Sequence, residues 1–189
     1  MNGVFRERKR LKQSLHLLSV LAVILIAGTL RLRALTTLPT DYDEDDYLRA
    51  AQEFTALIRT GNFTDFTETN YRPEHPPLNK ILFGVALLSE PEFPFIPDRP
   101  STAQPDQYLR KEPLRAARRV SALFGTLEAA ALAIINPLAG LLLGIHTYNV
   151  KYTSQVMLEG LPALTSLLSV LAYIRWKKTG KEKKHWLLL

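Results

Sequence analysis

The sequence predicts an all-α, multi-pass integral membrane protein with about four transmembrane helices. Apolar segments alternate with charged, proline-rich chain, so that 47% hydrophobic residues give a mean hydropathy of only −0.03. Lys and Arg residues gather at the ends of the apolar segments, as topology signals do. The same pattern predicts a large first extracytoplasmic loop that carries juxtamembrane helices.

The composition also excludes several classes of protein. None of the 189 residues is cysteine, which rules out a disulfide framework, a thiolate nucleophile and a thiolate metal site in this sequence. The net charge of +6 does not predict nucleic acid as a partner, because the basic residues do not follow one helix face.

The first apolar segment, residues 15–30, follows a basic stretch and resembles a secretory signal peptide. No clear small-x-small cleavage site follows it, and Arg31 and Arg33 interrupt the exit from the segment. We therefore expect an uncleaved transmembrane anchor over residues 15–35, after a cytoplasmic N-terminus over residues 1–14.

Three further candidate spans follow, at residues 120–135, 138–148 and 158–176. The Asn136-Pro137 pair predicts a turn, since a residue before proline disfavours the helical region. Residues 78–88 are too few for a span, which needs about 20 helical residues. We expect this short segment to lie along the membrane interface or to be re-entrant.

Charge determines the predicted topology. The basic stretches at residues 6–12 and 175–184 should both be cytoplasmic, which requires an even number of spans between them. The domains are then an outer loop over residues 36–118, three spans over residues 119–176, and a cytoplasmic segment over residues 177–189. That last segment ends in apolar residues that could begin another span.

Within the outer loop, residues 44–59 have apolar side chains at helical spacing, with acidic residues in the first turn. We expect an amphipathic helix that lies on the membrane surface. Six prolines between Pro91 and Pro113 predict that the later part of the loop is irregular.

Asp43 and Glu44 stand where this helix begins, and a helix N-terminus favours negative charge. They are candidates for a general base, although a solvated first turn has the same composition. Glu74 and His75 could position a phosphate, a hydroxyl or a metal ion, but a histidine before two prolines is also an ordinary turn residue.

Three charged residues in or next to the predicted spans are further candidates. A carboxylate in or next to a span is costly, so Glu128 and Glu159 suggest function. Alternatively, Glu128 packs against a polar neighbour and Glu159 reaches the interface water. Arg118 could bind a lipid phosphate in a bidentate manner, or serve as an interfacial anchor.

Four motifs occur in order along the chain: Asp43-Glu44-x-x-Tyr47, Glu74-His75-Pro76-Pro77-Leu78-Asn79-Lys80, Arg118-x-x-Ser121, and Tyr152-Thr-Ser-Gln155-Val-Met-Leu-Glu159. With the anchor helix before them, they resemble the GT-C glycosyltransferases, and most of all the branch of protein O-mannosyltransferases and lipid A aminoarabinose transferases. The resemblance covers nearly the whole chain.

The resemblance implies an inverting transfer of a sugar from a polyprenyl-phosphate donor to a lipid or protein acceptor outside the cytoplasm. It makes Asp43 the general base, with Glu44 beside it, and gives the donor phosphate to Arg118. Glu74 and His75 would order the pocket, and Glu159 matches an acidic residue at a later outer-facing helix end. The sequence identifies no certain cofactor, and a divalent metal ion is a candidate.

Family members are several hundred residues long, so we expect this chain to be an N-terminal fragment or an interrupted reading frame, with a separately encoded C-terminal half as a candidate partner. One alternative is a small non-catalytic membrane protein whose acidic loop binds a partner or lipid head groups. A transporter that relays protons through Glu128 and Glu159 is disfavoured, because the sequence has no visible broken helix pair or repeated half.

Overall fold

The computed structural model describes residues 2–68, 71–96 and 108–179, and every regular element in these ranges is helical. The elements are α1 (Asn2–Thr37), α2 (Glu44–Thr60), the 3-10 turn η1 (Thr64–Phe66), α3 (Pro77–Leu87), α4 (Lys111–Ile135), α5 (Pro137–Ile145), α6 (Thr147–Tyr152) and α7 (Gly160–Thr179). The prediction of an all-α protein is confirmed for these ranges. The terminal residues 185–189 lie outside them.

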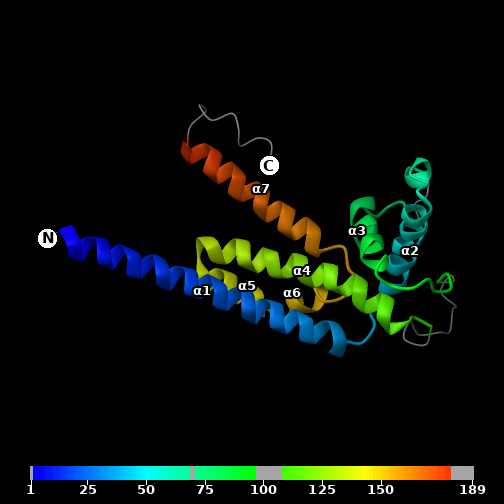
Figure 1. Cartoon of the computed structure of the whole chain (residues 1–189), viewed down its shortest axis with the longest axis horizontal. Helices are drawn as coiled ribbons and strands as arrows, with labels where there is room; N and C mark the ends of the chain where they lie inside the picture. The colour runs from blue at the N-terminus through cyan, green and yellow to red at the C-terminus, as the bar shows by residue number, and fades with distance from the viewer. Residues whose placement is uncertain (1, 69–70, 97–107, 180–189) are drawn as a thin grey trace.

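The helices form an elongated bundle with a smaller helical pair at one end (Figure 1). Helices α1, α4 and α5 pack along one another, and α7 packs against α4. Helices α2 and α3 pack together at the end of the bundle where α1 stops and α4 starts. The two helices of the predicted outer loop thus lie together at one end of the bundle.

Helix α1 contains the predicted anchor and extends beyond it on both sides. Among the described helices, α1 alone is both long and apolar enough to cross a membrane, over Glu7–Thr37. Leu17, Leu18, Leu21 and Leu25 are exposed along it. These leucines give α1 an exposed apolar face.

The predicted turn at Asn136 is confirmed. The Asn136 side chain caps α5, because its Oδ1 accepts hydrogen bonds from the backbone N–H groups of Leu138 (3.0 Å) and Ala139 (3.3 Å). The hairpin is tight, since a Cβ atom added to Gly140 would lie 2.6 Å from the Cα of Ala133. Glycine is therefore needed where α5 turns back along α4.

The segment predicted at residues 138–148 is interrupted at His146, whose backbone is extended (ψ 121°). Arg31 of α1 is buried at this break and donates to the Gly144 carbonyl (3.2 Å), to the Asn149 side chain and to the Thr153 hydroxyl (2.8 Å). The guanidinium thereby satisfies the Gly144 carbonyl, a backbone group that the interruption leaves without an intrahelical partner.

Two predictions about the outer loop need correction. The apolar face of α2 does not rest on a membrane surface, because Leu48, Ala51 and Phe54 are buried within the protein and α2 packs on α3. Helix α4 begins at Lys111, so the predicted boundary between residues 118 and 119 falls inside a continuous helix. Pro113 is compatible with this start, because N–H groups in the first turn have no acceptor within the helix and the N–H that proline lacks is not needed there.

The irregular segment is only partly described. Residues 91–96 contain no helix, as predicted, and residues 97–107 lie outside the described residues.

Candidate functional site

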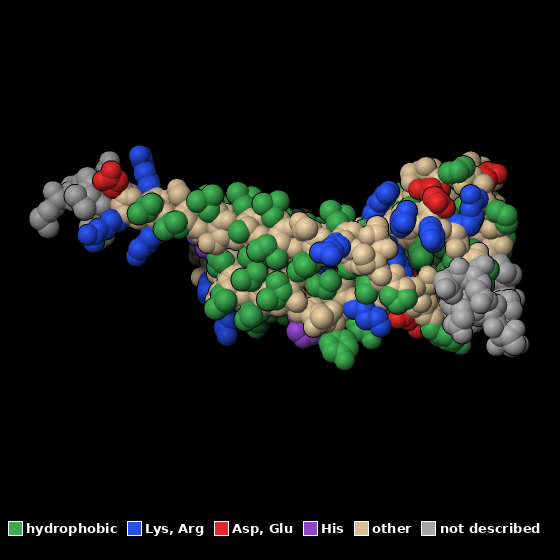
Figure 2. Space-filling model, turned by 90° about the horizontal axis from the view of Figure 1, so that it is seen from below, with side chains coloured by type: hydrophobic (Ala, Val, Ile, Leu, Met, Phe, Trp, Pro, Cys, Tyr) green, Lys and Arg blue, Asp and Glu red, His purple; other side chains and the backbone are tan. Residues whose placement is uncertain are grey.

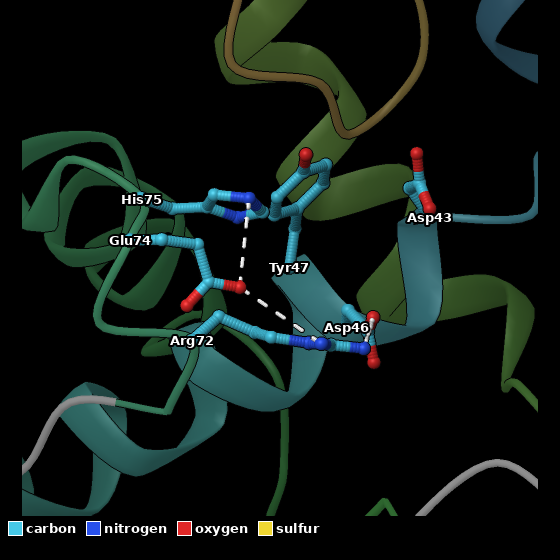
Figure 3. Close-up of a pocket in the computed structure, with 6 residues that line it drawn as sticks. All are labelled: Asp43, Asp46, Tyr47, Arg72, Glu74 and His75. Atoms are coloured by element: carbon cyan, nitrogen blue, oxygen red, sulfur yellow. Dashed lines mark hydrogen bonds and ion pairs between the residues drawn. The ribbon is translucent and has the colours of Figure 1, made fainter.

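A cavity of about 220 Å³ lies between the start of α2 and the loop that leads into α3. Six residues line it: Asp43, Asp46, Tyr47, Arg72, Glu74 and His75 (Figure 3). Three of them, Asp43, Glu74 and His75, are site residues predicted from the sequence. The fold therefore brings together two motifs that are about thirty residues apart in the chain.

Asp43 is the N-cap residue of α2, but its side chain makes no capping hydrogen bond. The side chain is exposed, and within the described part of the chain it has no hydrogen-bond or ion-pair partner. The start of a helix is a favourable place for a negative charge. Asp43 is thus a carboxylate whose oxygens are open to a ligand in the cavity.

Glu44, the next residue, points away from the cavity into the protein. Its carboxylate is fully buried and accepts from the Arg118 Nε (2.8 Å) and Nη2 (2.5 Å), and from the backbone N–H groups of Asp41 (2.9 Å) and Val156 (2.6 Å). It is the centre of a buried polar cluster, and it does not reach the cavity beside Asp43.

Arg118 also lies elsewhere than the sequence suggested. Besides Glu44, its guanidinium donates to carbonyls at the end of α1, those of Leu35 (2.9 Å), Leu38 (3.1 Å) and Pro39 (3.0 Å). The last carbonyls of a helix have no intrahelical partner, so a guanidinium placed there is well satisfied. Arg118 is buried and does not line the cavity, where the predicted phosphate contact would be made.

The cation that does line the cavity is Arg72, which the sequence reasoning missed. Its Nη2 lies 2.6 Å from the Asp46 Oδ2, and the Tyr71 hydroxyl donates to the other oxygen of Asp46 (3.0 Å). The hydrogen bond to Asp46 raises the pKa of the Arg72 guanidinium, as does the charge of Asp46. The one sequence signal is position, since Arg72 stands two residues before Glu74.

Tyr47 forms the middle of the cavity wall, with His75 on one side and Asp43 on the other (Figure 3). The centroids of the Tyr47 and His75 rings are 5.1 Å apart. Burial raises the Tyr47 pKa to about 12, and the nearby Asp43, Glu159 and Asp46 charges add to this effect. The phenol is therefore protonated at neutral pH and can donate a hydrogen bond. Glu159 itself is exposed just before α7 and is not among the residues that line the cavity.

The last two residues of the Glu74–Lys80 motif hold the cavity loop in place. Lys80 is fully buried, and its Nζ donates to the carbonyls of Tyr71 (2.9 Å) and Arg72 (2.8 Å). Asn79 donates to the Leu158 carbonyl (2.8 Å), which ties α3 to the segment before α7. These two side chains position the loop and do not line the cavity.

Glu128 lies apart from the cavity, inside the bundle, where it accepts from the Asn149 side chain (3.1 Å) rather than from Ser121 or Thr126. The His, Asp and Glu side chains of the described residues form no group of three or more that could hold a metal ion. In the cavity, the His75 Nε2 lies 3.9 Å from the Glu74 Oε1, and the His75 Nδ1 has no hydrogen-bond partner among the described atoms.

Comparison of the chain with protein-family models, curated proteins and solved structures finds no match. The activity of the chain is therefore inferred from the cavity and from its place at the end of the bundle.

Proposed function

We propose that this chain is a membrane glycosyltransferase that moves a sugar from a polyprenyl phosphate to a lipid or protein acceptor outside the cytoplasm, with inversion. The observation that carries the proposal is the exposed Asp43 carboxylate, which has no described partner and lines a polar cavity next to Tyr47 and Arg72. A general base needs such an open carboxylate within reach of the acceptor hydroxyl.

The proposal includes a membrane-spanning bundle in the cell membrane. Helices α1, α4, α5 with α6, and α7 would be four spans that alternate in direction, with both chain ends in the cytoplasm and the cavity outside (Figure 1). In support, on the face drawn in Figure 2, hydrophobic side chains gather over the middle of the elongated body, and most charged side chains lie toward its two ends. A bilayer would favour this distribution.

In the proposed reaction, Asp43 accepts the proton of the acceptor hydroxyl while the hydroxyl oxygen attacks the anomeric carbon. The bond between that carbon and the phosphate oxygen breaks, and the phosphate takes the electron pair. The protonated Tyr47 phenol, between Asp43 and His75, can donate a hydrogen bond to a sugar oxygen. The buried Glu44 and Arg118 pair fixes the start of α2, and with it Asp43.

The test is turnover of a radiolabelled polyprenyl-phosphate sugar by membranes that carry the chain, alone and together with any separately encoded C-terminal half. We expect Asp43→Asn to lower turnover by about 10²-fold or more, because it removes a general base. Asp65→Asn is the matched control, since Asp65 lies in η1, outside the cavity, where Asn62 donates to it.

Equal turnover in the Asp43 and Asp65 variants would refute the assignment of the base. If no membrane preparation turned over the donor but the chain still bound lipid head groups, the result would instead favour the non-catalytic alternative.

A further inference from the structure

Arg72 supplies positive charge in a cavity that is otherwise acidic. Asp43, Asp46 and Glu74 line the same space, and Arg118 is buried elsewhere. A phosphate would be repelled by these carboxylates unless a cation lay between them and its oxygens. Among the residues that line the cavity, Arg72 is the one that carries a permanent positive charge.

The backbone at Arg72 is held in an unusual conformation. Its φ of 57° is in the left-handed region, and no other non-glycine residue of the described ranges has a positive φ. Such a conformation persists only where the surroundings impose it. Here Lys80 binds the Tyr71 and Arg72 carbonyls from inside the protein, and the His75 N–H donates to the Arg72 carbonyl (3.0 Å). The buried lysine therefore directs the arginine side chain toward the cavity.

The Arg72 guanidinium still has donors to offer. Its Nη2 is bonded to Asp46, but its Nη1 lies 3.8 Å from the Glu74 Oε1, beyond hydrogen-bond distance. Within the described residues, neither Nη1 nor Nε makes a hydrogen bond. The side chain is 46% exposed. The guanidinium, which also pairs with the Glu74 charge through Nη1, therefore keeps N–H groups at Nη1 and Nε that can donate to phosphate oxygens.

We infer that Arg72 is the phosphate ligand of this site. The inference rests on the proposed function and adds the residue that receives the leaving group. The donor phosphodiester carries one negative charge. When the bond from the anomeric carbon to the phosphate oxygen breaks, that oxygen keeps the electron pair and the product phosphate gains a second charge. Arg72 balances this charge, while Asp43 holds the acceptor proton.

Asp46 orients the arginine in this arrangement. One oxygen of Asp46 accepts from the Arg72 Nη2 and the other accepts from the Tyr71 hydroxyl, so the guanidinium is held at one nitrogen. The contacts thus form a chain that runs from Tyr71 to Asp46, from Asp46 to Arg72, and from Arg72 to the phosphate. Asp46 is a positioning residue, because it reaches the phosphate only through Arg72.

The experiment measures equilibrium binding of a short-chain polyprenyl phosphate to the purified chain in detergent, with the matching polyprenol and inorganic phosphate as separate probes. We expect Arg72→Gln to weaken polyprenyl-phosphate binding at least tenfold and to leave polyprenol binding unchanged. Arg72→Lys keeps a charge beside Asp46, so it should fold like the wild type and bind with an intermediate loss. Arg119→Gln, an exposed arginine outside the cavity, is the matched control.

Binding within twofold of the wild type in Arg72→Lys and Arg72→Gln would overturn the inference. The inference would also fail if inorganic phosphate displaced the polyprenyl phosphate from the wild type while the Arg72 variants still bound the polyprenyl phosphate with wild-type affinity.

If the wild type transfers the sugar and the Arg72 variants transfer it equally fast, the phosphate assignment is wrong and the proposed transferase activity stands. Binding that depends on Arg72, without transfer by any preparation, would keep the phosphate site and remove the transferase.

Discussion

The replacement Glu44→Gln tests the buried cluster that positions the candidate base. Glutamine can still accept at one oxygen, where the Val156 N–H and the Arg118 Nε donate. At the other position an amide NH2 would face the Arg118 Nη2 and the Asp41 N–H, which are both donors. Two hydrogen bonds are lost, and a buried guanidinium is left without a counter-charge.

Two independent estimates of the cost agree. Two hydrogen bonds to a charged acceptor are worth about 3–6 kcal/mol together. Removal of one member of a buried ion pair costs about 3–5 kcal/mol. This is a large fraction of the free energy of unfolding of a typical domain, about 5–15 kcal/mol. We expect the melting temperature to fall by about 6–20 °C.

The assay is thermal unfolding of the purified chain in detergent, followed by far-ultraviolet circular dichroism. Glu112→Gln is the matched control, because Glu112 is exposed in the first turn of α4, the helix that carries Arg118. The double variant Glu44→Leu with Arg118→Leu should lose less free energy of unfolding than the sum of the losses in Glu44→Leu and Arg118→Leu, because no buried charge then remains unpaired. A loss below about 1 kcal/mol in Glu44→Gln, or strict additivity, would refute the reasoning.

Three further predictions concern packing, topology and pH. A Cβ atom at Gly125 would lie 2.5 Å from a buried guanidinium nitrogen, so Gly125→Ala should lower the free energy of unfolding by about 1–3 kcal/mol, whereas Gly28→Ala, with its nearest neighbour at 3.7 Å, should be neutral in the same melting assay. Single cysteines placed at the exposed positions Glu92 and Lys178 of this cysteine-free chain should react differently with an impermeant maleimide in intact cells: Glu92 should be labelled and Lys178 labelled only after permeabilisation. Protection of the cysteine at Glu92 would mean that α3 crosses the membrane. The Tyr47 pKa is raised to about 12 in the folded protein, above the unfolded value near 10, so the folded state holds this proton more tightly and stability falls as pH rises from about 10 to 12. Tyr47→Phe should reduce this alkaline loss, measured as the change in melting temperature between pH 8 and pH 11, and an unchanged slope would contradict the shift.

Several elements could be predicted because their signals are local. Helix α2 was predicted over residues 44–59 from apolar spacing and acidic first-turn residues, and it occupies Glu44–Thr60. The turn at Asn136 follows from the steric effect of Pro137 on the residue before it. In the same way, the length and apolar composition of α1 identify a helix able to cross a membrane. Each of these signals acts within a few neighbouring residues.

The interruption at His146 was not predictable, although it lies in the same apolar sequence. A continuous helix from residue 138 satisfies periodicity and composition equally well. The break is stabilised by Arg31, which is more than one hundred residues away and supplies hydrogen bonds to Gly144 and Asn149. No local pattern contains that information.

The division of roles between Asp43 and Glu44 shows what only the tertiary structure decided. The sequence placed two carboxylates at a helix start and could not separate them. Successive helical residues point about 100° apart, so one carboxylate faces the cavity and the other faces Arg118 of α4.

The arginines follow the same logic. Motif spacing favoured Arg118, but the orphan carbonyls at the end of α1 bind it, while Lys80 holds the loop that brings Arg72 to the cavity. The sequence by itself determined which segments are helical and which motifs carry charge, because those properties depend on neighbouring residues. Which charge is buried and which remains open to a ligand depended on the partners that folding brings from distant parts of the chain, since burying a charge is costly without such a partner.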